Sequence, residues 1–209
     1  MRIDRAAIPF VIIAAVPAAI IAWMWGSLAA LPALLLPVAI AAFFRDPDRT
    51  ASQDPALVLS PADGTVMHAG QADPADAPDE RAWLQVTIFL SVLDVHINRA
   101  PVSGRVSRVD YHPGTFLPAY RAEAAKNERS EIWIDHGGVP IVFRQVVGAM
   151  ARRVVCRLTK GQHVEAGDRV GLMKFGSRMD VFLPLTATIT VKPGDRTVAG
   201  ETVVARLAG

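Results

Sequence analysis

The chain has 209 residues, of which 51% are hydrophobic, and this composition excludes a disordered protein. Its 22 Lys and Arg nearly balance its 20 Asp and Glu, which argues against a strongly basic nucleic-acid-binding surface as the main function. The single cysteine, Cys156, excludes an intrachain disulfide and a CxxC metal site, and it is typical of a reducing compartment.

The first predicted element is an apolar anchor over residues 1–44. Residues 6–44 contain no Asp, Glu, Lys, Arg or His. This stretch is far longer than the apolar part of a signal peptide, about 7–15 residues, and about twice the length of one membrane span. Because Gly26-Ser27 lies near its middle, we expect a helical membrane hairpin with segments at residues 7–25 and 28–44. A hairpin that lies shallowly in one leaflet is the alternative.

Positive residues flank both outer ends of this hairpin: Arg2 and Arg5 before it, and Arg45 and Arg49 after it. The positive-inside rule predicts that both ends lie in the cytoplasm. We therefore expect a protein of the cell membrane whose following domain is on the cytoplasmic side.

Residues 45–209 are predicted to form one mainly β domain. They contain runs of about 5–8 residues rich in Val, Ile, Thr and Phe, separated by Gly, Pro or Asp, which indicate about ten strands. Two similar glycine-containing segments, at 160–171 and 192–203, are typical of the tight hairpins of barrel-sandwich domains. Only residues 118–129 look helical. The predicted fold is a barrel-sandwich-like β domain with little helix.

Motifs for common cofactors are absent from the sequence. The five histidines show no HxH, HxxxH or HExxH spacing, so no metal site is predicted. There is no GxxxxGK[ST], no GxGxxG after a strand and no GxSxG, which disfavours nucleotide binding and α/β-hydrolase chemistry.

Three positions could carry chemistry. His96 follows an apolar strand and lies near Asp94, and a histidine there can be a general base or a structural residue. Asp63 lies in an Ala-Asp-Gly sequence, which is an ordinary turn but can also orient a histidine. Gly176-Ser177 interrupts an apolar run. Glycine allows backbone conformations that would bring the Ser177 hydroxyl to the Gly176 carbonyl carbon, as an N→O acyl shift requires, although a flexible turn is the simpler interpretation.

Seven segments occur in order along the chain: FFRDPDR, SPADGTV, FLSVLDVHINRAPVSGRV, YHPGTF, NERSEIWID, GAMARRVVCRL and VGLMKFGSRMDVFLP. With these segments the chain closely resembles the short form of the bacterial phosphatidylserine decarboxylase proenzymes. The resemblance extends from about residue 40 to the C-terminus, with a matching apolar segment before it.

The resemblance implies an enzyme of phospholipid biosynthesis that converts phosphatidylserine to phosphatidylethanolamine and CO2 without a metal or a diffusible cofactor. It implies self-cleavage between Gly176 and Ser177 into a large β chain (residues 1–176) and a small α chain (residues 177–209), which stay together as a heterodimer. Ser177 would become a pyruvoyl group that forms a Schiff base with the substrate amine. Asp63 and His96 match the family's catalytic aspartate and strand-end histidine.

The chain also departs from the longer relatives. They have a second histidine three residues after the first, where this chain has Arg99, so the roles of Asp63 and His96 stay open. His112, in YHPG, is a further candidate for a base or for substrate binding. Arg152 and Arg153 are candidates for holding the headgroup phosphate or carboxylate, or else are outward-facing arginines of a strand.

Two other functions remain open at this point. The first is a membrane-tethered, non-enzymatic barrel-sandwich adaptor, which would stay one intact chain. The second is a membrane-bound serine hydrolase with Ser177 as nucleophile and Lys174 or His96 as base. The phospholipid and the two cleaved chains are the expected partners, a homo-oligomer is left open, and no nucleic acid is expected.

Overall fold

The computed structural model describes residues 2–120, 124, 126–149, 154–174 and 176–208. The chain forms two compact units, Met1–Asp48 and Arg49–Gly209.

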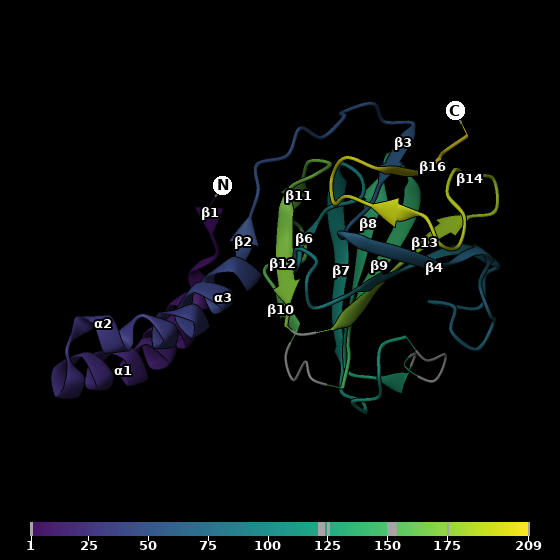
Figure 1. Cartoon of the computed structure of the whole chain (residues 1–209). Helices are drawn as coiled ribbons and strands as arrows, with labels where there is room; N and C mark the ends of the chain where they lie inside the picture. The colour runs from purple at the N-terminus through teal and green to yellow at the C-terminus, as the bar shows by residue number, and fades with distance from the viewer. Residues whose placement is uncertain (1, 121–123, 125, 150–153, 175, 209) are drawn as a thin grey trace. The chain divides into compact units, whose positions relative to one another are not determined.

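The N-terminal unit is a helical hairpin. Its first arm is one continuous α-helix that contains Pro17, whereas the second arm is divided into short helices: Pro32 begins a 3-10 turn, and Pro37 lies in the first turn of the helix that follows it. The two arms pack against each other, the rings of Phe10 and Phe44 stack at 5.7 Å, and a short antiparallel pair joins the two ends (Figure 1). The elements are β1 (Arg2–Ile3), η1 (Arg5–Ala7), α1 (Ile8–Trp25), α2 (Ser27–Ala30), η2 (Pro32–Leu34), α3 (Leu35–Phe43) and β2 (Arg45–Asp46).

The two arms differ in length. The helical stretch Arg5–Trp25 is long and apolar enough to cross a membrane. The apolar stretch Ser27–Phe43 is shorter, and at about 1.5 Å per residue it falls below the ~30 Å thickness of a hydrocarbon core. The expected apolar helical hairpin is therefore present, with unequal arms.

The second unit confirms the mainly β prediction. Its largest sheet has eight antiparallel strands and curls into a half barrel (Figure 1). In order across the sheet, the strands are β11 (His163–Val164), β7 (Gly104–His112), β8 (Arg129–His136), β9 (Val139–Val147), β13 (Ser177–Pro184), β5 (Trp83–Leu90), β4 (Gly64–Gln71) and β15 (Arg196–Thr197).

Two smaller sheets complete this unit. One has the order β10 (Val154–Cys156), β12 (Arg169–Met173) and β6 (Ile97–Arg99). The other has the order β14 (Thr188–Ile189), β16 (Val203–Arg206) and β3 (Leu57–Leu59). Each of the two glycine-containing segments noted in the sequence contains a two-residue strand, β11 or β15, that forms one edge of the large sheet.

The helix expected at 118–129 is wrong at its C-terminal end, although residues 124 and 126 before that end are in 3-10 helical conformation. Asn127 forms a β-bridge with Thr115, and Arg129 begins β8. Arg129 lies opposite His112 on β7 and Val146 on β9, so its backbone is part of the sheet and not of a helix.

The two faces of the large sheet have different environments, and β13 shows this directly. Met179 and Val181 point into the main hydrophobic core. Phe182 points to the outer face, where it packs with Trp83, Trp133 and Val142. Because successive side chains of a strand alternate, Ser177 is on the inner face, and Arg178 is on the outer face.

Candidate active site

The bond between Gly176 and Ser177 lies at the start of β13, in the middle of the large sheet. Gly176 has a φ of +68°, a left-handed conformation that glycine adopts without the steric cost of a side chain. Ser177 is paired with Leu90 on β5 and Val147 on β9 and is completely buried. Among the described residues its hydroxyl has no hydrogen-bond partner, which is unusual for a buried polar group and makes Ser177 a candidate functional residue.

The carbonyl group of Gly176 packs against a second glycine. A β-carbon at position 148 would collide with the Gly176 carbonyl oxygen, so Gly148 lets the two backbone segments approach each other. The Gly176 carbonyl thus lies against backbone on one side, next to the residue whose hydroxyl is buried.

His96 lies in the turn between β5 and β6 and is only 2% exposed. Its Nδ1 is 2.9 Å from the backbone carbonyl oxygen of Asp94. A carbonyl only accepts, so Nδ1 carries the proton in the neutral ring and Nε2 carries the lone pair that a general base needs. The backbone amide of Met173 donates to the His96 carbonyl at 3.3 Å, which ties His96 to the end of β12, four residues before Ser177.

The carboxylate of Asp94 stabilises this turn. It accepts hydrogen bonds from the backbone N–H and the hydroxyl of Ser91, at 2.8 and 2.7 Å, and forms an ion pair with Arg196. Burial alone would raise the pKa of Asp94, but the hydrogen bonds from Arg196 and Ser91 outweigh burial and hold that pKa below its usual value. Asp94 therefore orients His96 through its backbone, and its carboxylate stays charged.

Asp63 is held by other partners. Its carboxylate accepts hydrogen bonds from the backbone N–H of Ala199 at 2.7 Å and from Arg49 at 2.9 Å. No hydrogen bond joins Asp63 to His96 within the described part of the chain. Arg49 also reaches Glu201, at 3.5 Å, so the Asp63 turn binds the linker after the hairpin to the C-terminal segment.

Arg99 occupies the position of the second histidine of the longer relatives, and it is buried. Its guanidinium donates to the backbone carbonyl of Gly167 at 2.9 Å, and its backbone N–H donates to Pro61. This side chain holds two turns together, and a guanidinium is a poor base because it stays protonated.

Asn98, Asn127 and Gln145 are functional candidates that the sequence analysis missed. Gln145 lies opposite Met179 on the inner face, and its side-chain amide donates to Asn98 at 2.8 Å. Asn127 donates to the backbone carbonyls of Val147 and Leu117, both at 2.7 Å, and so fixes a loop beside Ser177. Asn98 and Gln145 each keep a buried polar atom that has no partner among the described residues. The sequence did contain a signal for such candidates, namely asparagine and glutamine within otherwise apolar, strand-forming segments.

His112 lies on the other side of the sheet. It is opposite Arg129, on the outer face with Arg108 and Glu131, whereas Ser177 faces inward. The structure thus places His96 in the turn that follows Leu90, the strand partner of Ser177, and places His112 on the opposite face of the sheet. Arg152 and Arg153 lie outside the described residues.

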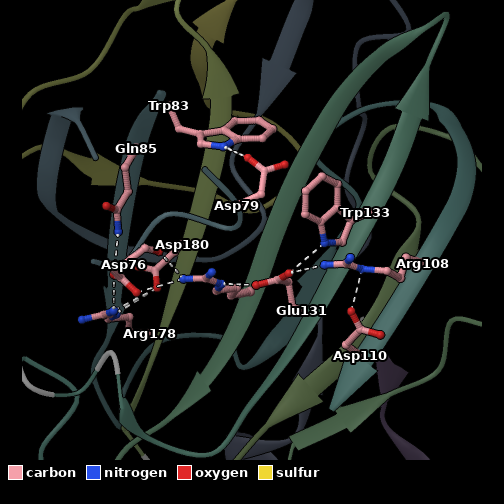
Figure 2. A network of polar contacts seen from close by, with 11 residues as sticks. Asp76, Asp79, Trp83, Gln85, Arg108, Asp110, Glu131, Trp133, Arg178 and Asp180 are labelled. Carbon is pink, nitrogen blue, oxygen red and sulfur yellow. Dashed lines mark hydrogen bonds and ion pairs between the residues drawn. The ribbon is translucent and has the colours of Figure 1, made fainter. Parts of the chain in front are cut away.

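The outer face contains a chain of ion pairs (Figure 2). Glu131 accepts from Arg144 at 2.6 Å, from Arg108 at 3.0 Å and from Trp133 at 2.8 Å, and Arg108 also binds Asp110. Burial alone would raise the pKa of Glu131, but these partners, with Arg144 first, lower it overall.

The ligand atoms of Asp110, His112 and Glu131 come within 4.8 Å of one another, as in a metal site. The guanidinium of Arg108 already bridges the two carboxylates and supplies the positive charge that a metal would bring. This cluster is therefore better explained as an ion-pair network than as a metal site.

A pocket of about 550 Å³ opens on the same outer face. Its polar lining includes Asp76, Lys126, Arg129, Arg144 and Arg178. The pocket is on the side of the sheet away from the Ser177 side chain.

The fold and the site define a mainly β protein with a buried glycine-serine bond at the head of its central strand. Residues 37–205 match the family model of phosphatidylserine decarboxylase. The chain is 41% identical over 207 residues to the phosphatidylserine decarboxylase proenzyme of Solibacter usitatus, covering 99% of this chain and 97% of the relative. It is 42% identical over 209 residues to the proenzyme of Zymomonas mobilis, covering 95% of this chain and 84% of the relative. It is 46% identical over 165 residues to the proenzyme of Pelodictyon phaeoclathratiforme, covering 78% of this chain and 77% of the relative. The chain belongs to the phosphatidylserine decarboxylase family, as its motifs indicated.

Proposed function

We propose that this protein decarboxylates phosphatidylserine to phosphatidylethanolamine after cutting itself between Gly176 and Ser177. The observation that carries the proposal is the buried Ser177 hydroxyl, next to a glycine carbonyl that a second glycine holds in place. The names of the relatives supply the substrate, and the word proenzyme in those names agrees with a processing step.

The chemistry of the cut needs only this chain and water. The Ser177 oxygen attacks the Gly176 carbonyl carbon, the peptide C–N bond breaks, and an ester forms while the nitrogen takes the proton. Removal of the α-proton of residue 177 then expels the Gly176 carboxylate and leaves a dehydroalanine. Water replaces the nitrogen, which leaves as ammonia, and a pyruvoyl group remains at the start of the small chain. His96, with its lone pair on Nε2, is our candidate for the base.

The surroundings of residue 177 fit such a group. It would lie between Leu90 and Val147, where residue 177 is buried and shielded from bulk solvent. The group supplies a carbonyl that condenses with the lipid's serine amine and accepts the electrons released with CO2. His96 is the candidate for returning a proton to the substrate, and Arg152 and Arg153 remain candidates for holding its headgroup.

The arrangement of strands supports a stable pair of cleaved chains. The small chain would contribute β13, β14, β15 and β16. Of these, β13 lies between β5 and β9, β15 pairs with β4, and β16 pairs with β3, all of which belong to the large chain. Hydrogen bonds in two sheets would therefore hold the chains together after the cut.

Exposed apolar residues on two loops support a lipid substrate. Val92 and Leu93 follow β5 directly beyond Leu90, the partner of Ser177, and Leu93 is 83% exposed. Phe116 is exposed on the loop that leads to Ala119, next to Gly148. We propose that these loops contact the bilayer, that the hairpin is the membrane anchor, and that Arg2, Arg5 and Arg45 keep its ends on the cytoplasmic side.

The test is the intact mass of the purified full chain and of Ser177→Ala under denaturing conditions. We expect wild type to give chains of residues 1–176 and 177–209, the second with a blocked N-terminus, and Ser177→Ala to stay whole. Release of CO2 from phosphatidylserine by wild type alone then identifies the substrate. A wild-type chain that stays whole during incubation with membranes would contradict the proposal and favour the tethered adaptor.

A further inference from the structure

Ser177 and Arg178 point to opposite faces of β13. On the outer face, Arg178 donates from Nε and Nη2 to Asp180 at 3.1 and 3.0 Å, and from Nη2 to Asp76 at 3.4 Å (Figure 2). The Arg178 side chain is 7% exposed, and that of Asp180 is completely buried. Burial opposes the charge on Arg178, but Asp180 and Asp76 outweigh it and raise the pKa, so the guanidinium stays charged.

Both acidic partners connect β13 to segments that precede the proposed cut. Asp180 also accepts a hydrogen bond from the hydroxyl of Thr87, on β5, at 2.8 Å. Asp76, on the segment between β4 and β5, also accepts from Arg144, on β9, at 2.9 Å. Through one residue each, Arg178 is therefore tied to both strands that flank β13.

The cut changes what holds residue 177 in place. Before it, the covalent bond to Gly176 continues the strand. Afterwards residue 177 is a free chain end, and free ends of strands fray. A keto group there also carries no backbone N–H, so residue 177 can donate no backbone hydrogen bond to either neighbouring strand. Arg178 is then the first residue of the small chain with a side chain bound to the large chain.

We propose that Arg178 is a positioning residue that keeps residue 177 in register between β5 and β9 after the chain has been cut. This inference rests on the proposed self-cleavage at Gly176–Ser177. It predicts that losing the ion pairs of Arg178 leaves the cut intact and impairs the steps that follow it.

The experiment compares Arg178→Met and Arg178→Lys with wild type in the full chain. Arg108→Met is the matched control, because Arg108 forms ion pairs with Asp110 and Glu131 on the same face and, among the described residues, no hydrogen bond or ion pair with β13. Intact mass measures the cut, CO2 release from phosphatidylserine micelles measures turnover, and hydrogen exchange measures the mobility of amides 178–181. The same Arg178 variants combined with Ser177→Ala provide the uncut chain for comparison.

We expect Arg178→Met to be cut as completely as wild type and to turn over substrate about tenfold more slowly or worse. Its amides 178–181 exchange about tenfold faster than in wild type, but only in the cut protein. Arg178→Lys keeps the positive charge but loses the paired N–H donors of the guanidinium, so we expect its turnover and exchange rates to be intermediate. Arg108→Met is expected to stay within about twofold of wild type in turnover.

Unchanged exchange and turnover in Arg178→Met would overturn the inference. An equal acceleration of exchange in the uncut chain would also overturn it, because it would indicate a general structural role. An Arg178→Met chain that is not cut would overturn it as well, because Arg178 would then act before the cut. A wild-type chain that is not cut overturns the proposed function itself, whereas failure of the inference alone leaves wild type cut and active.

Discussion

The carbonyl oxygen of Gly176 occupies the space in which a β-carbon of residue 148 would lie. The β-carbon of Ala119 borders the same space, 3.2 Å from that position. Neither neighbour is the end of a flexible side chain, so a side chain at residue 148 could be accommodated only by a shift of the backbone. The orientation of the Gly176–Ser177 bond thus depends on the absence of a side chain at residue 148, which directly follows Val147, the strand partner of Ser177.

Gly148→Ala is therefore expected to slow the self-cleavage by about tenfold or more, because the displaced carbonyl no longer meets the Ser177 hydroxyl at the right geometry. A time course of intact mass after synthesis measures the rate. Gly70→Ala is the control, since a β-carbon there would only make ordinary contacts, at 3.8 Å or more, with the His68 ring. Equal rates for the two variants would contradict this account of Gly148.

Replacing His96 is expected to impair catalysis without unfolding the protein. His96→Ala removes the candidate base, and we expect the cut or the subsequent turnover to fall by about 10²-fold or more. His112→Ala, on the opposite face of the sheet, is expected to leave both within about twofold. If His112→Ala were the more damaging variant in the mass and CO2 assays, the assignment of His96 as base would be wrong.

Asp63 and Arg49 are expected to act as one structural pair. Breaking a largely buried hydrogen-bonded ion pair leaves one charge without its partner, so Asp63→Asn and Arg49→Met should each lower the free energy of unfolding by about 1–3 kcal/mol. Their effects should be less than additive in the double variant. Urea unfolding of uncut Ser177→Ala chains measures this. Strictly additive losses, or a loss of the cut with unchanged stability, would favour a catalytic role for Asp63 instead.

The stability of the turn that carries His96 is expected to depend on acid pH. The pKa of Asp94 in the folded state lies below the unfolded value of 3.8, so the stabilisation is complete above that value and is lost as pH falls through the lower folded pKa. Arg196→Met should shift the acid unfolding midpoint of a Ser177→Ala chain to higher pH. The exposed cation Lys160, replaced by Met, serves as the control. No difference between the two midpoints would argue against the pairing of Asp94 with Arg196.

Membrane contact by the loop after β5 can be measured with a nitroxide label. In a Cys156→Ser chain in phospholipid vesicles, a label at Leu93→Cys should be more accessible to dissolved oxygen than to a polar nickel complex. Leu185 is the matched control, because it is also exposed and apolar but lies beyond the other end of β13, about 26 Å away along a strand of eight residues. Water-exposed labels at both positions would contradict the proposed contact.

The long strands could be predicted from sequence because their pattern is local. The Val- and Ile-rich runs that became β5, β8, β9 and β13 contain enough apolar side chains to identify them. β6, β11 and β15 have two or three residues and were not expected, since such strands exist only through their partners. The same limit explains the error at Arg129, where pairing with two neighbouring strands outweighed the helical preference of the residues before it.

The candidate site was predictable only in part. Gly176 and Ser177 could be identified because the pair interrupts an apolar run, and His96 because it follows a strand. The partners of Asp63, by contrast, come from residues 49 and 199, which no spacing rule connects. The opposite orientation of His112 depends on strand register, which the sequence does not reveal without the pairing of β7 with β8.

The central position of β13 also determines when the protein can mature during synthesis. A ribosome makes this strand after β5 and β9, and in the large sheet these two strands are joined only through β13. Until β13 emerges, these two strands present unpaired edges, and the long-range pairing that buries Ser177 cannot form. Self-cleavage should therefore begin only after β13 has been made and has entered the sheet, so the order of folding itself protects the nascent chain from being cut too early.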